Sequence, residues 1–110
     1  TSSAPSAPSG RTWTVHFALQ SVEPLAFAPP TWLQSCTKVR VVGYTCNLGD
    51  DQVNRTIGEA RATTVRERLL SAGITAPIQT ASAGAADPVG DNSTPEGRRA
   101  NRRVVVSCPP

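Results

Sequence analysis

An arginine lies among apolar residues in the longest helical pattern of the sequence, where its charge could hold an anion. Residues 51–72 predict a helix. At about 100° per residue, Ile57, Val65 and Leu69 share one face of that helix, and Arg61 falls on the same face. A buried guanidinium is costly unless it is paired or functional. Two interpretations remain open: a structural arginine that satisfies a loop or a carboxylate, and an arginine offered to an anionic ligand.

The turn before this helix could supply the other groups of an anion site. Residues 43–51 follow a short β-branched run over 38–43, which predicts a buried strand. Asp50 or Asp51 is expected to cap the helix. The first backbone N–H groups of a helix point toward such a turn and form a ready anion site.

The remaining elements predict a small α+β domain. Apolar and polar residues alternate over 11–19, which is typical of a strand. Pro29 and Pro30 can open a short helix that ends near Gln34, and Thr94 and Pro95 can start another. The expected order is β-α-β-α-β-(α)-β, a mixed four-stranded sheet with helices on one side. Its elements are expected at 11–19, 29–34, 38–43, 51–72, 78–82, from 94 onward, and 102–107.

Two parts of the chain are expected. Residues 1–10 are rich in Ser, Pro and Ala and predict a flexible linker, which enters a domain formed by residues 11–110.

Composition argues against several classes of function. A net charge of +3, with only two Trp, two Phe and one Tyr, is not typical of a nucleic-acid binder. One histidine, His16, and three cysteines without a Cys-x-x-Cys pair do not favour a metal site, and no cofactor is expected. No nucleophile–base pair is evident, so no enzyme is expected. No apolar run approaches the roughly 20 residues of a membrane span.

Three motifs, taken together, carry a resemblance to a known family. They are residues 43–49 (GYTCNLG), 54–65 (NRTIGEARATTV) and 91–104 (DNSTPEGRRANRRV). The sequence resembles the OmpA-like peptidoglycan-binding domain of outer-membrane porins, peptidoglycan-associated lipoproteins and flagellar stator proteins. The resemblance covers roughly residues 13–106 and implies the α+β fold predicted above.

The resemblance also implies a ligand site. In the family, an aspartate and an arginine hold the diaminopimelate residue of the cell-wall peptide. Arg61 matches the arginine, whereas Cys46 stands at the aspartate position and Tyr44 at that of the motif's histidine. Of the two neighbouring arginines, Arg102 is expected to be structural and Arg103 to be structural or at the rim of the site. The expected ligand-binding residues are Thr45, Cys46, Asn47, Asn54, Arg61 and Arg103.

The resemblance implies a non-catalytic module that anchors its parent protein to peptidoglycan through the diaminopimelate-containing stem peptide. The expected location is the periplasm, with a tether to the outer membrane through an upstream region. A thiol at position 46 cannot pair with an ammonium as a carboxylate would. The alternative is therefore a degenerate domain that serves as a structural or protein-interaction part of an envelope secretion or conjugation assembly. Other envelope proteins are the partners expected in that case.

The three cysteines allow one pairing to be discarded from the residues alone. About six strand residues, at about 3.3 Å each, hold Cys36 and Cys46 roughly 20 Å apart, and a disulfide needs Cα atoms within about 7 Å. In the family, the last strand runs antiparallel beside the second. The resemblance therefore implies a disulfide between Cys36 and Cys108, with Cys46 a free thiol at the pocket. Such a disulfide would favour an oxidising compartment.

Overall fold

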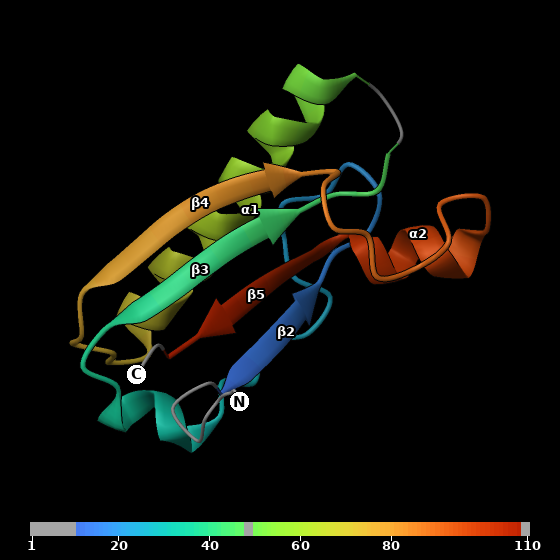
Figure 1. Ribbon diagram of the computed structural model, residues 1–110. Coiled ribbons are helices and arrows are strands. Elements are labelled where there is room, and N and C mark those ends of the chain that lie inside the picture. Colours follow the sequence, from blue (N-terminus) through green and yellow to red (C-terminus); the bar gives the residue numbers. More distant parts are fainter. Residues whose placement is uncertain (1–10, 48–49, 109–110) are drawn as a thin grey trace.

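Four strands form one mixed sheet in the computed structural model, which describes residues 11–47 and 50–108 (Figure 1). β5 lies antiparallel between two neighbours, whereas the last pair of strands is parallel. Residues 1–10, for which the linker is predicted, lie outside the described residues. In pairing order the strands are β2 (Thr12–His16), β5 (Arg103–Ser107), β3 (Val39–Tyr44) and β4 (Ile78–Gly84).

The long helix connects the two parallel strands. α1 (Asp51–Ser71) covers one face of the sheet, as a crossover between parallel strands must (Figure 1). The 3-10 helix η2 (Thr31–Ser35) precedes β3, and α2 (Pro95–Asn101) precedes β5. These elements confirm the predicted α+β class. The first strand is shorter than predicted, because it stops at His16 and the next residue makes only an isolated bridge.

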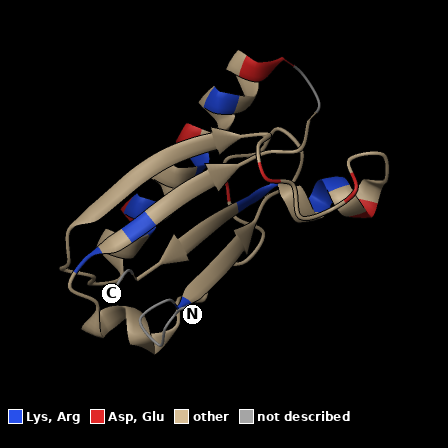
Figure 2. Ribbon diagram, in the orientation of Figure 1, with Lys and Arg blue, Asp and Glu red and all other residues tan. Residues whose placement is uncertain are grey.

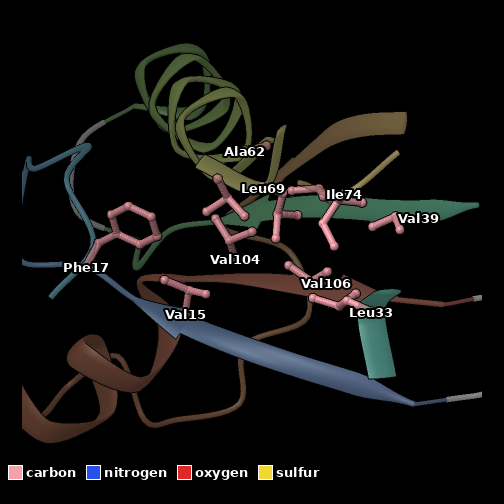
Figure 3. Packing of buried hydrophobic residues seen from close by; sticks show 11 residues of the cluster. Val15, Phe17, Leu33, Val39, Ala62, Leu69, Ile74, Val104 and Val106 are labelled. Atoms are coloured by element: carbon pink, nitrogen blue, oxygen red, sulfur yellow. The ribbon is translucent and has the colours of Figure 1, made fainter. Parts of the chain in front are cut away.

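The core lies between α1 and the sheet (Figure 3). Side chains alternate along a strand, so Val104 and Val106 face α1 while Arg103 and Val105 face the other side. Fully burying a side chain of this size contributes about 1.5–3 kcal/mol. Leu25 is 60% exposed because its loop stays at the surface. The buried cluster consists of Val15, Phe17, Leu33, Val39, Val41, Ala62, Val65, Leu69, Ile74, Val104 and Val106.

Two local features fix α1 against the end of β3. The Asp50 carboxylate caps the helix and accepts a hydrogen bond from the Val53 backbone N–H at 2.8 Å. Gly43 and Gly58 let the two backbones approach closely, because a Cβ atom at Gly43 would overlap the Gly58 carbonyl oxygen. The first half of α1 is therefore held directly over the turn that follows β3.

A disulfide joins the opposite end of the sheet. Cys36 and Cys108 are bonded, with their Cα atoms 5.8 Å apart, as the family resemblance implies. Because β3 and β5 are antiparallel, the residue before β3 lies next to the residue after β5. Cys46, at the other end of β3, is a free cysteine.

Candidate functional site

A cavity of about 130 Å³ lies where β3 ends and α1 begins. It is formed by the loop after β2, the turn after β3, the first half of α1 and the residue before β5. β3 and β5 are antiparallel neighbours, which brings the end of one beside the start of the other. The cavity is lined by Leu19, Gln20, Thr45, Cys46, Val53, Asn54, Ile57, Arg61 and Arg102.

Arg61 is fixed by backbone carbonyls rather than by an acid. Only 1% of its surface is exposed, and its guanidinium lies 5.2 Å from the centre of the Phe17 ring. Nε donates to the Ser21 carbonyl at 2.9 Å, Nη1 to the Tyr44 carbonyl at 3.2 Å and Nη2 to the Ala18 carbonyl at 3.1 Å. These bonds tie the loop after β2 to the end of β3. They use three of the five N–H donors of the guanidinium.

The charge of Arg61 is only partly compensated by this arrangement. Burial, and then the like charge of Arg102, lower the pKa of the Arg61 guanidinium to about 10, while Cys46 acts in the opposite direction. At neutral pH the group still carries its positive charge. Carbonyl dipoles solvate that charge but do not cancel it, so the cavity keeps a buried cation on its wall.

Arg102 brings a second guanidinium to the same cavity. Its Nε donates to the Phe17 carbonyl at 3.1 Å, and its Nη1 lies 3.9 Å from the Cys46 sulfur. The other N–H groups of Arg102 make no hydrogen bond within the described residues. Neither Arg102 nor Arg61 forms an ion pair in that part of the chain. Figure 2 shows basic residues at the start of β5, whereas β2 and β4 carry no charged residue.

Asn101 holds the segment that positions Arg102. Its side chain is fully buried and binds the loop before α2. The Asn101 Oδ1 accepts from the backbone N–H groups of Val89 and Gly90, at 2.7 and 2.8 Å. Its Nδ2 donates to the Gly90 carbonyl and to the Asn92 side chain. The residue at the end of α2 thus fixes the backbone from which the next residue, Arg102, projects.

The turn after β3 supplies two small polar groups. Cys46 is 3% exposed and carries a free thiol, which is a weak donor and a weak acceptor. The Thr45 hydroxyl is buried and makes no hydrogen bond within the described residues. Buried hydroxyls are normally satisfied, and this one is an unpartnered donor and acceptor beneath the cavity surface.

Comparison with known proteins identifies the family. The model of the OmpA family matches residues 31–102. The chain belongs to the OmpA family. The match includes the turn after β3, all of α1 and Arg102, and so contains the cavity apart from the loop after β2.

Relatives of this OmpA-family chain include two curated bacterial proteins. It is 38% identical over 77 residues to the peptidoglycan-binding protein ArfA of Mycobacterium tuberculosis, a match that covers 67% of this chain and 24% of ArfA. It is 41% identical over 73 residues to the outer-membrane lipoprotein YfiB of Pseudomonas aeruginosa, which covers 66% of this chain and 44% of YfiB. The chain therefore spans less than half the length of these relatives.

A solved structure has the same fold. The peptidoglycan-associated lipoprotein of Burkholderia pseudomallei superposes with a TM-score of 0.70 at 22% identity, over 86% of this chain and 87% of that one. This similarity concerns the fold, and the mixed sheet with α1 on one face is therefore an OmpA-like architecture.

The OmpA-family cavity brings together four of the residues predicted for the site. Thr45, Cys46, Asn54 and Arg61 all line it. Asn47 does not line it in the described part of the chain, because it is exposed at a bend where the chain leaves the sheet.

Arg103, which is expected to be structural or at the rim of the site, is not among the residues that line the cavity. It lies on the sheet face opposite α1, where its guanidinium stacks 3.8 Å from the centre of the Tyr44 ring and donates to the Asp87 carbonyl at 2.9 Å. Burial lowers its pKa. Arg102, which is expected to be structural, does bond to the Phe17 carbonyl, and it also lines the cavity. It lies just before β5, on the same side as Val104 and Val106, which face α1.

Proposed function

We propose that this OmpA-family domain is a non-catalytic module that anchors its parent protein to peptidoglycan through the diaminopimelate-containing stem peptide. The observation that carries the proposal is the cavity wall with two guanidinium groups, Arg61 and Arg102, and no acidic residue in its lining. Guanidinium groups bind carboxylates through charge-assisted hydrogen bonds, the strong class of hydrogen bond in proteins.

The cavity offers a carboxylate two kinds of contact. Arg102 has N–H donors that make no hydrogen bond within the described residues and can form direct bonds to the ligand. Arg61 is immobilised by its three carbonyl partners, so its charge is preorganised and little side-chain entropy is lost on binding. A hydrogen bond to a charged group contributes about 1.5–3 kcal/mol, which corresponds to roughly a tenfold to hundredfold change in affinity.

The apolar part of the lining suits the rest of such a ligand. Leu19, Val53 and Ile57 line the cavity, and the first two are exposed at its edge. A diaminopimelate side chain is a short aliphatic chain that ends in a carboxylate and an amine. Its methylene groups can pack against these residues while the carboxylate reaches the arginines.

We place this activity in the periplasm, with a tether to the outer membrane through an upstream region. The disulfide between Cys36 and Cys108 supports an oxidising compartment. The names of ArfA and YfiB associate those relatives with peptidoglycan and with the outer membrane. Both relatives are longer than this chain, and the match covers only part of each. The role of the whole parent protein is therefore proposed together with that of the domain.

Co-sedimentation with purified peptidoglycan sacculi tests the function. We expect the oxidised domain to sediment with sacculi, and Arg102→Gln to weaken its binding about tenfold or more. Arg99→Gln is the matched control, because Arg99 is an exposed arginine on α2 outside the cavity. A folded domain that stays in the supernatant would contradict the proposal and favour the role of a degenerate domain in an envelope assembly. Equal losses for both variants would show non-specific charge attraction.

A further inference from the structure

The charges around the cavity differ from those needed to hold an ammonium group. Among the described residues, its lining contains two positive groups, Arg61 and Arg102, and no carboxylate. The two acids nearest to Cys46 in sequence do not line the cavity. Asp50 caps α1, and Asp51 lines a separate hollow beside Gly84. An ammonium that enters this cavity would meet like charges without a compensating anion.

The neutral acceptors at the cavity do not replace a carboxylate, because the side-chain amides of Gln20 and Asn54 in its lining carry no charge. The carbonyl groups of Ala18, Ser21 and Tyr44, which could otherwise solvate an ammonium, already accept hydrogen bonds from Arg61. The thiol of Cys46 is a weak acceptor. The Asn54 side chain lines the cavity and makes no hydrogen bond within the described residues, so its carbonyl oxygen can satisfy one N–H group. An ammonium brings three N–H groups and a full charge, whereas an amide brings one N–H group and no charge.

We infer that the cavity selects a carboxylate whose neighbouring nitrogen is acylated rather than a free ammonium. In diaminopimelate the terminal carbon carries both groups, and a cross-link between stem peptides acylates that amine. The preferred ligand is therefore the cross-linked form of the stem peptide, with its carboxylate beside the two arginines and its amide N–H directed to the side-chain carbonyl of Asn54. This inference rests on the proposed function and adds the chemical state of the ligand.

Cys46 is the residue that determines this preference. It lies within 3.9 Å of the Arg102 guanidinium and contributes to the electrostatics around Arg61. A carboxylate at the same place would neutralise part of the arginine charge and supply a strong acceptor for an ammonium. We expect Cys46→Asp to shift the preference toward the free amine, whereas Cys46→Ser adds no charge and keeps the wild-type order of affinities.

A matched pair of ligands tests the inference. The probes are one soluble muropeptide with a free diaminopimelate amine and the same muropeptide after N-acetylation, each titrated calorimetrically into the oxidised domain. We expect the acetylated ligand to bind about tenfold more tightly. Equal affinities, or tighter binding of the free amine, would overturn the inference while the proposed function stands. If neither ligand binds, the proposed function of the cavity fails, and the inference fails with it.

The variants give a second readout that does not depend on the absolute affinity. The ratio of the affinity for the acetylated ligand to the affinity for the free amine should fall in Cys46→Asp. In Cys46→Ser the acetylated ligand should still bind more tightly. A ratio that does not change in Cys46→Asp, with the variant folded, would show that position 46 does not determine the preference.

Discussion

The two ends of the sheet are built from opposite kinds of interaction. Where β3 begins, the disulfide between Cys36 and Cys108 joins the strands beside an apolar group that includes Leu33, Val39 and Ile74 (Figure 3). Where β3 ends, Arg61 and Arg102 face a cavity whose lining has no acid. One end is closed covalently and is apolar, while the other is open and positively charged.

Under the proposed function, stabilisation and ligand binding fall at different ends of the same strands. Unpaired guanidinium groups in a partly buried site destabilise a fold unless other interactions compensate. The disulfide joins residues 72 apart in sequence, and closing a loop of this size contributes about 4 kcal/mol in the chain-entropy model. That contribution can offset the cost of keeping a charged cavity ready for an anion.

Removing the disulfide should produce the largest change in stability. In the double variant Cys36→Ser/Cys108→Ser, the free energy of unfolding should fall by about 4 kcal/mol, measured by denaturant titration. At a temperature where the variant is still folded, its affinity for sacculi should match that of the wild type. Loss of binding by the folded variant would show that the two ends are coupled.

Arg61→Ala should lower the free energy of unfolding by about 3 kcal/mol, because it leaves three carbonyl groups and the Phe17 ring without their partner. Arg68→Ala is the matched control on the same helix. Its pair with Glu23 is exposed, so its loss should change stability by no more than about 1 kcal/mol. Similar losses for both variants would contradict the structural role of Arg61.

Modification of Cys46 should affect binding with little effect on stability. An alkyl group added to this thiol fills part of the cavity, and we expect sacculus binding to fall about tenfold or more. The reagent should react slowly, because the thiol is buried. Cys46→Ala, treated with the same reagent, is the control. Full binding by the alkylated protein would place the ligand elsewhere.

The smallest effect on stability is expected at low pH, from Asp91 in the loop before α2. Hydrogen bonds from the Ser93 hydroxyl and backbone N–H hold the pKa of the Asp91 carboxyl below its ordinary value of 3.8. Because the pKa of Asp91 is lower in the folded state, the stabilising contribution of its carboxylate is complete above the pKa of the unfolded state. This contribution is lost as pH falls through the pKa of the folded state. The free energy of unfolding, measured between pH 5 and pH 2, should fall less steeply with decreasing pH for Asp91→Asn than for the wild type. Parallel curves would exclude this contribution.

Sequence patterns predicted most of the fold because its elements are locally determined. The β-branched run of β3, the alternation along β2 and the Asp50 cap each depend on neighbouring residues, and each is present. The burial of Arg61 also follows from helical periodicity. Predicting the disulfide between Cys36 and Cys108 required the order of the strands in the sheet, and that order came from the family resemblance.

Sequence patterns predicted the site less completely, because its lining depends on how separate segments meet. Val53 lies outside the apolar face of α1 in projection and is exposed, yet it lines the edge of the cavity. Leu19 lies beyond the end of β2, so strand alternation no longer determines its direction. Arg102 could be assigned to the α1 side only once Val104 and Val106 were known to face the helix.

Under the proposed function, peptidoglycan binds at the charged end of the sheet, between Arg61 and Arg102. Amide chemical-shift mapping during titration with soluble muropeptides tests this location. We expect the largest shifts at Thr45, Cys46 and Asn54, with the amides around the Cys36–Cys108 disulfide unchanged. Largest shifts at the disulfide end, or along the exposed edge of β4, would contradict it.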